Sequence, residues 1–167
     1  MRQDNRKPHR LPTIQNIGIH DLVRGHYTVS NPSRTVLIRI LNDVREEQEY
    51  PPAGPFLRSH AFVFLDIGDP PPPSPLSAPC VTPNLEEEYK RAITPAQAES
   101  IARVMLEALR DGHDVVAHCT AGVSRSGAIV EAAVRMGFAD PGTYRAPNAR
   151  VLRLILEAAT RFQRARS

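Results

Sequence analysis

A ten-residue stretch late in the chain, residues 118–127, limits the possible folds more than any other part of the sequence. It reads His-Cys-Thr-Ala-Gly-Val-Ser-Arg-Ser-Gly, so that five residues separate Cys119 from Arg125. The apolar run 115–117 before it predicts a buried strand, and residues 128–136 after it predict a helix. The cysteine is therefore expected on a loop between the end of a strand and the beginning of a helix.

Such a loop is suited to bind a tetrahedral oxyanion. Backbone N–H groups at the beginning of a helix lack partners within the helix and carry partial positive charge. A loop that curls into the helix turns N–H groups inward, and the small residues Ala121 and Gly122 allow a tight curl. The same field should lower the pKa of the Cys119 thiol. Arg125 can hold two phosphate oxygens with its planar fork, and Ser126 is placed to donate a hydrogen bond to the sulfur.

This stretch resembles the signature of cysteine-based protein tyrosine phosphatases, and most of all the compact dual-specificity branch with its bacterial and phage relatives. The resemblance rests on the Cys-x5-Arg-Ser pattern, the histidine before it and the Ala-Gly pair within it. It is strong over residues 114–136 and extends over about 60–160. It implies an α/β fold with a central, mainly parallel sheet of four to five strands flanked by helices.

The cysteine, the arginine and the loop between them predict a reaction without a metal or other cofactor. The Cys119 thiolate attacks phosphorus and forms a phosphocysteine, which water then hydrolyses. The loop binds the equatorial phosphate oxygens through Thr120, Ala121, Gly122, Val123, Ser124 and Arg125. His118 is expected to orient the loop. Asn148 belongs to a Pro-Asn pair that resembles the one bracing the loop in dual-specificity phosphatases, and it can also act as the N-cap of its own helix.

Departure of the leaving group requires a carboxylic acid opposite the thiolate, and two aspartates compete for this role. Asp66 and Asp69 both follow the strand predicted over residues 61–65 and precede a proline run. The Leu-Asp-Ile-x-acidic-Pro pattern resembles the bacterial members of the group, which favours Asp66 and leaves Asp69 as the alternative acid. Either carboxylate can instead cap a turn.

The rest of the chain alternates between predicted strands and helices. Strands are expected at residues 14–19 at an edge, 35–41 in the core, 61–65 and 114–118. Thr94 is followed by Pro and, three residues on, by Gln, which predicts a helix N-terminus, and Gly112 predicts its end. A last helix follows Asn148. The strand–helix–strand order favours a parallel sheet with the site at the carboxyl ends of its strands.

The length of 167 residues predicts one domain over residues 13–167, preceded by a flexible tail at 1–12. Residues 70–92 are rich in proline and polar side chains, which predicts a long surface loop or lid. No apolar run approaches the roughly 20 residues that a membrane span needs. No secretory signal opens the chain, so we expect no membrane association.

Composition narrows the expected partners and compartment. Two cysteines, Cys80 and Cys119, favour free thiols in a reducing cytoplasm, with a regulatory disulfide between them as the alternative. The six histidines are scattered, so no metal site is predicted. The basic chain ends lack interleaved aromatic residues, and we therefore expect no nucleic-acid partner. The chain is expected to be a monomer that acts on a phosphorylated protein or peptide.

The predicted function is hydrolysis of phosphotyrosine, with phosphoserine and phosphothreonine as further substrates left open. A lipid substrate is disfavoured because the loop contains no lysine. One alternative is a module that binds phosphorylated partners without turnover. Another is a rhodanese-like or redox thiol enzyme, although the Arg-Ser pair that opens the helix suits phosphate better.

Overall fold

In the computed structural model, residues 10–69 and 87–165 are placed well enough to be described. Within them, ten labelled elements follow one another along the chain: β1 (Ile14–Gly18), α1 (Ile19–Arg24), η1 (Pro32–Arg34), β2 (Thr35–Leu41), α2 (Glu46–Glu49), β3 (Arg58–Val63), α4 (Pro95–Asp111), β4 (Asp114–Cys119), α5 (Arg125–Met136) and α6 (Ala149–Arg164). The described strands form one sheet in the order β1-β4-β2-β3, and every pair of neighbours is parallel. The predicted α/β fold is confirmed, with four strands.

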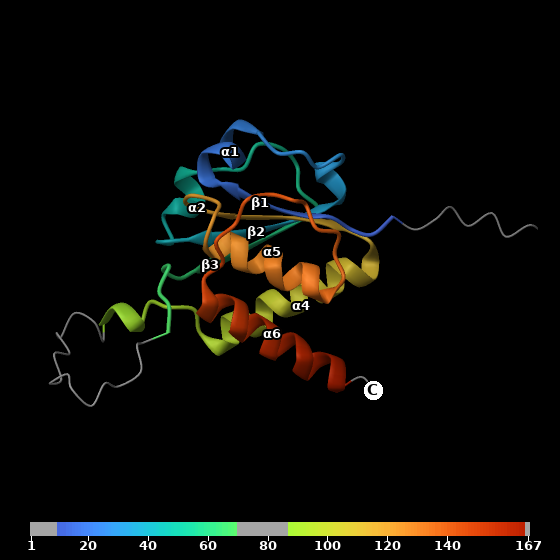
Figure 1. Cartoon of the computed structure of the whole chain (residues 1–167). Helices are drawn as coiled ribbons and strands as arrows, with labels where there is room; N and C mark the ends of the chain where they lie inside the picture. The colour runs from blue at the N-terminus through green and yellow to red at the C-terminus, as the bar shows by residue number, and fades with distance from the viewer. Residues whose placement is uncertain (1–9, 70–86, 166–167) are drawn as a thin grey trace, which may run out of the picture.

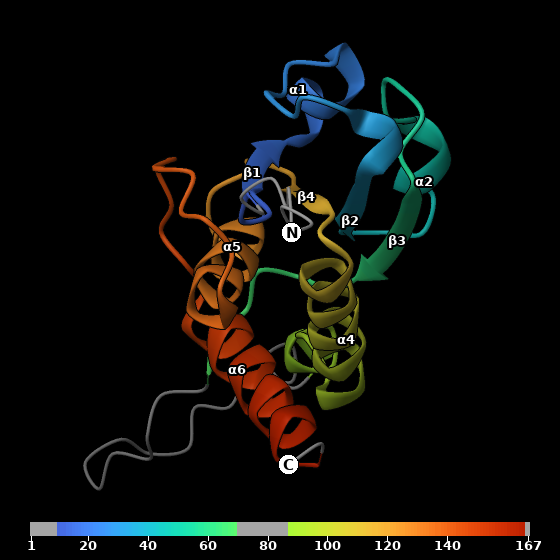
Figure 2. The same cartoon turned by 90° about the vertical axis from the view of Figure 1, so that its right-hand side faces the viewer.

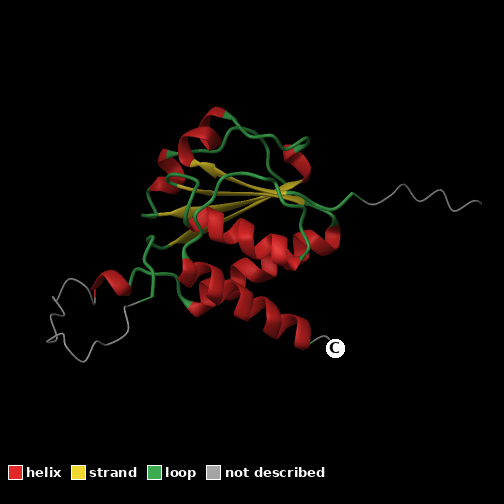
Figure 3. Ribbon diagram, viewed as in Figure 1, coloured by secondary structure: helices red, strands yellow, loops and turns green. Residues whose placement is uncertain are grey.

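The sheet lies between two layers of unequal thickness (Figures 1 and 3). On one face, α4 and α5 cover the strands, and α6 packs against these two helices on the side away from the sheet (Figure 2). On the other face, α1 covers a small cluster made of Ile17, Leu22, Leu37 and Val116. The central strands β2 and β4 are buried along their whole length, as expected for parallel strands covered on both faces.

All predicted strands and helices are found, and one of the strands is shifted along the chain. β1 lies at an edge of the sheet and β2 in its interior, as expected for residues 14–19 and 35–41. The third strand was predicted over 61–65 but runs from Arg58 to Val63, because the partner strand ends at Leu41 and the chain beyond Val63 turns away. Leu65 N–H then donates to the carbonyl of Arg91. The short elements α1, η1 and α2 were not predicted.

The helix ends follow the expected local chemistry. Thr94 and Gln97 form a reciprocal capping box at the beginning of α4. Gly112 ends this helix with a φ of 72°, a left-handed conformation that favours glycine. α5 begins at Arg125, as predicted, and the side chain of Asn148 caps α6 by accepting a hydrogen bond from Val151 N–H. The Asn148 cap fixes where α6 begins, and the beginnings of both α5 and α6 border the cysteine loop.

The tail predicted over residues 1–12 and the loop predicted over about 70–92 lie largely outside the described residues. Of the tail, Arg10 is described, and its guanidinium pairs with Asp114 at 2.6 Å. Of the loop, residues 87–89 are helical, and Ala92 is buried. Cys80 also lies outside the described residues. Over the described ranges, the chain contains no helix with the length and apolar character that a membrane crossing requires.

Candidate active site

The cysteine loop joins β4 to α5 and is held from outside through its carbonyl groups. Four of these carbonyls accept hydrogen bonds from neighbouring segments: those of Thr120, Gly122, Val123 and Ser124. With its carbonyls turned outward, the loop presents N–H groups to its interior, and Gly122 N–H donates to the Cys119 sulfur at 3.3 Å. Gly122 has a φ of +75°, and a Cβ there would lie 2.3 Å from the backbone of Ile17. Only glycine fits this position.

The Cys119 sulfur is buried and surrounded by hydrogen-bond donors. It lies 3.2 Å from Ser126 Oγ, and the thiol is free. Burial raises the pKa of the Cys119 thiol, but hydrogen bonds from the Ser126 side chain, Ser126 N–H and Gly122 N–H, with the charge of Arg125, outweigh burial and lower the pKa below its ordinary value. The loop therefore favours the nucleophilic thiolate.

Arg125 is 5% exposed, and its guanidinium is only partly occupied by protein partners. Nη1 donates to Asn42 Oδ1 and to the Phe64 carbonyl, both at 2.8 Å, and these two bonds use both of its hydrogens. Nη2 donates to Thr120 Oγ1 at 3.0 Å and has a second N–H. The buried Nε has no partner among the described residues. Since Nε and Nη2 share one edge of the guanidinium, the remaining donors can hold two oxygens of one anion.

Asn42, just beyond the end of β2, is a site residue that the sequence reasoning missed. Its side-chain NH2 donates to Thr120 Oγ1 at 2.9 Å and to Glu46 Oε1 at 3.0 Å, while its oxygen accepts from Arg125. Glu46 also accepts from the Asn42 backbone N–H. A signal was present, because the carboxyl ends of neighbouring parallel strands meet at one edge of the sheet and Asn42 follows a predicted strand. The contact of Arg125 with the Phe64 carbonyl left no such signal, since any residue has a carbonyl.

The structure brings only one of the two candidate acids to the loop. Asp66 Oδ1 accepts hydrogen bonds from Ser124 Oγ and from Asn148 Nδ2, both at 2.8 Å. Asp69 instead lies against α6, where Arg150 Nη1 is 3.1 Å and Arg153 Nη2 is 2.9 Å from its Oδ1. Hydrogen bonds from Arg153 hold the pKa of the Asp69 carboxyl below its usual range. Asn148 is thus both the N-cap of α6 and a partner of Asp66.

His118 is fully buried beside the cysteine and accepts a hydrogen bond at Nε2 from Arg39 Nε, at 3.3 Å. Burial, followed by the charge of Arg39, lowers the pKa of His118 to about 4, so the imidazole is neutral at pH 7. The other two nitrogens of Arg39 donate to the carbonyls of Glu47 and Tyr50. His118 therefore connects β4 to the segment that follows β2. The sequence reasoning missed Arg39, although a charged residue inside a predicted core strand was a signal.

Over the described ranges, no three or more His, Cys, Asp and Glu side chains gather in a way that could hold a metal ion. The donors assembled at the loop are N–H, hydroxyl and guanidinium groups, which suit an anion.

No protein-family model matches the sequence, and no curated protein matches it either. Solved structures with similarity to this one include the following two. A mouse protein assigned as a dual specificity phosphatase, complexed with zinc tungstate, is 16% identical over 99% of this chain and 96% of that chain, with a TM-score of 0.45. A variant of human DUSP28 is 16% identical over 96% of this chain and all of that chain, with a TM-score of 0.43.

Proposed function

We propose that this chain is a cysteine-dependent protein phosphatase similar to the dual-specificity branch, of the bacterial and phage type. The observation that carries the proposal is the state of Arg125. Its Nη1 is occupied by protein acceptors, while Nε and one N–H of Nη2 have no partner among the described residues. A buried cation with two donors left along one edge, next to a thiol of lowered pKa, is suited to a phosphate group.

In the first step, the Cys119 thiolate attacks phosphorus and the bond to the ester oxygen breaks. The remaining donors of Arg125 and the inward N–H groups of residues 120–125 bind the three equatorial oxygens as charge builds up on them. Because Asn42 and Phe64 hold Nη1, the guanidinium is already oriented before substrate arrives. The product of this step is a phosphocysteine.

Asp66 protonates the leaving oxygen and then, as a carboxylate, accepts a proton from the water that hydrolyses the phosphocysteine. Its bonds to Ser124 and Asn148 support this role, because they hold one carboxyl oxygen at the rim of the loop. Ser126 Oγ, at 3.2 Å from the sulfur, stabilises the thiolate as it leaves in the second step. His118 stays neutral and orients the loop.

The substrates we propose are phosphotyrosine residues of a protein or peptide, with phosphoserine and phosphothreonine as further candidates. A phenolate is a weaker base than an alkoxide, so the departure of a phenol depends less on protonation by the acid. We propose a monomer that needs no cofactor. A reducing compartment such as the cytoplasm would keep the Cys119 thiol reduced.

The experiment compares the wild type with Cys119→Ser and with the matched control Cys80→Ser on p-nitrophenyl phosphate. The wild type and the control should turn over, and Cys119→Ser should show no turnover while still binding inorganic phosphate in a titration calorimeter. Phosphate binding without turnover by the wild type would instead indicate a binding module. Turnover that survives in Cys119→Ser would contradict the proposal.

A further inference from the structure

The segment that carries Asp66 contacts the beginning of α6 through two carboxylates. Asp66 accepts a hydrogen bond from Asn148, the N-cap of α6. Asp69, three residues after Asp66, accepts hydrogen bonds from two arginines in the first turns of α6. Arg150 Nη1 is 3.1 Å away, Arg153 Nη2 is 2.9 Å away and Arg153 Nε is 3.4 Å away. The segment is therefore fastened on both sides of Gly68.

Side chains supply most of what fixes this segment. Residues 64–69 form no helix or strand. Their backbone bonds to the rest of the described chain occur at its beginning, where Phe64 and Leu65 N–H donate to neighbouring carbonyls and Arg125 binds the Phe64 carbonyl. A Cβ at Gly68 would meet nothing within 4 Å, and glycine is the most conformationally free residue. Without the ion pairs of Asp69, the chain beyond Asp66 would have a wide choice of conformations.

We propose that Asp69 is a positioning residue whose ion pairs with Arg150 and Arg153, here called the α6 latch, hold Asp66 in place for proton transfer. The inference rests on the proposed function, in which Asp66 is the general acid. It gives the second aspartate of the Leu-Asp-Ile-Gly-Asp stretch a role of its own. Asp69 remains ionised in this role, since the two guanidinium groups oppose its protonation.

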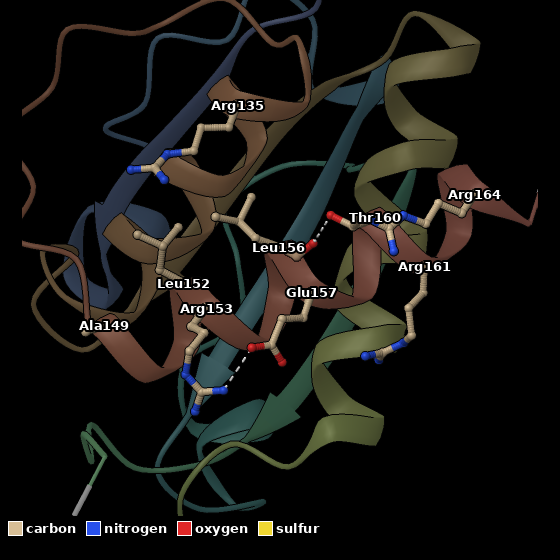
Figure 4. Close-up of a pocket in the computed structure, with 9 residues that line it drawn as sticks. All are labelled: Arg135, Ala149, Leu152, Arg153, Leu156, Glu157, Thr160, Arg161 and Arg164. Atoms are coloured by element: carbon tan, nitrogen blue, oxygen red, sulfur yellow. Dashed lines mark hydrogen bonds and ion pairs between the residues drawn. The ribbon is translucent and has the colours of Figure 1, made fainter. Parts of the chain in front are cut away.

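Arg153 is itself held in place on the surface of α6. Figure 4 shows its guanidinium reaching Glu157, one helical turn further on, and the two groups are 3.1 Å apart. Arg153 thus bridges Asp69 and Glu157. Arg150 is less exposed than Arg153, with 23% of its side chain accessible against 47%. The α6 latch therefore joins residues 64–69 to two arginines of α6, one of which is also held by Glu157.

The α6 latch is partly exposed, so its effect on turnover should be modest and dependent on salt. The chain contains a matched control, the ion pair of Arg161 with Glu99, which joins α6 to α4. Its side chains are 56% and 45% accessible, close to the 47% and 42% of Arg153 and Asp69. Replacing Arg161 removes a similar pair from the same helix without touching the acid segment.

The test measures kcat/KM of Asp69→Asn, Arg153→Leu and the control Arg161→Leu on two substrates, p-nitrophenyl phosphate and phenyl phosphate. Phenol is the poorer leaving group and needs the acid more. The latch predicts a loss of about fivefold on phenyl phosphate for the first two variants, a loss below about twofold on p-nitrophenyl phosphate, and wild-type behaviour for the control. Added salt should shrink the difference between wild type and Asp69→Asn.

Two results would overturn the latch. If Asp69 were itself the acid, Asp69→Asn would abolish the basic limb of the pH profile while Arg153→Leu kept full activity. If neither variant differed from the control, the ion pairs would have no positioning role. A wild type without turnover would refute the proposed function instead. In that case hydrogen exchange of the amides of residues 65–69 still tests whether the ion pairs hold the segment. The α6 latch predicts faster exchange in Asp69→Asn and Arg153→Leu than in Arg161→Leu, and equal exchange in all three would overturn it.

Discussion

Two buried arginines, one on β2 and the other at the beginning of α5, differ in which of their nitrogens have protein acceptors. Arg39 on β2 is 3% exposed, and each of its three nitrogens donates to a protein acceptor: His118, the Glu47 carbonyl and the Tyr50 carbonyl. Arg125, after β4, is 5% exposed and keeps a buried Nε without a partner among the described residues. A buried donor without an acceptor costs free energy, and at a loop of inward N–H groups a bound anion would supply the missing acceptor.

We therefore expect Arg39 to serve the stability of the fold and Arg125 to serve the chemistry of the site. Arg39, whose three nitrogens all have protein acceptors, ties β4 to the segment after β2, and its removal should weaken the fold. Arg125 keeps a buried Nε without a partner among the described residues, beside the cysteine loop, and its removal should weaken the chemistry. Four variants test this contrast, and they are ordered from the largest expected effect to the smallest.

Arg125→Lys should lower kcat on p-nitrophenyl phosphate by about 10²–10³-fold, because a lysine lacks the second donor of the fork that stabilises the transition state. The free energy of unfolding, measured by urea titration, should change far less than the activity suggests. A variant that retained wild-type turnover would show that the unpaired donors of Arg125 do not serve phosphate.

Arg39→Leu should show the opposite pattern. Its loss leaves the buried His118 Nε2 and two partly buried carbonyls without these donors, and we expect the free energy of unfolding to fall by about 3 kcal/mol. Turnover per folded molecule should remain within about tenfold of the wild type, measured at a temperature where the variant is folded. A large loss of turnover in a stable variant would break the proposed division between the two arginines.

His118 lies beside Arg39 and makes the fold sensitive to acid. Its pKa is about 4 in the folded chain against 6.5 ordinarily, so between these values the unfolded chain binds more protons. Stability should be unaffected by His118 above pH 6.5 and should fall as pH falls to about 4, by on the order of 3 kcal/mol at about 1.4 kcal/mol per pH unit. The difference in urea stability between wild type and His118→Asn, followed from pH 7 to pH 5, measures it. Equal pH slopes in the two proteins would contradict the assignment.

Asn42→Ala should have the smallest effect of the four. It removes one acceptor from Arg125 Nη1 and one donor to Thr120, while the Phe64 carbonyl still holds the guanidinium. We expect kcat to fall by about tenfold, since one neutral hydrogen bond to a charged group contributes roughly 1.5 kcal/mol. The control is Asn31→Ala, at an exposed N-cap of η1 away from the site. Similar kinetics for Asn42→Ala and the control would remove Asn42 from the site.

The sequence predicted the parts of the fold that depend on contiguous patterns. Caps at Thr94 and Gly112 and the β-branched run of residues 35–41 act locally, and the structure has them where expected. The strand predicted over 61–65 was misplaced because its end is set by where its partner strand stops, which is a tertiary property. The helix α1 was missed because it is short and contributes to only one small hydrophobic cluster, which leaves little periodicity in the sequence.

The candidate site shows the same difference between local patterns and long-range contacts. Cys119 to Ser126 lie in one stretch, so their relation could be predicted from spacing alone. The contact of Asp66 with Asn148 joins residues 82 positions apart, and that of Arg125 with Asn42 joins residues 83 positions apart. The sequence pattern favoured Asp66 over Asp69 as the acid, but it could not show which of the two faces the loop. The fold separates them, because the first reaches Ser124 and the second reaches Arg153.

The central claim is that the Cys119 sulfur forms a covalent bond to phosphorus. The direct measurement is an acid-quenched single turnover of Asp66→Ala with p-nitrophenyl phosphate, followed by mass spectrometry of the digested protein. With the acid and base of the second step removed, we predict about one phosphate per chain, on the peptide that contains Cys119. An active wild type that yields no phosphate on this peptide, or phosphate on another residue, would contradict the account.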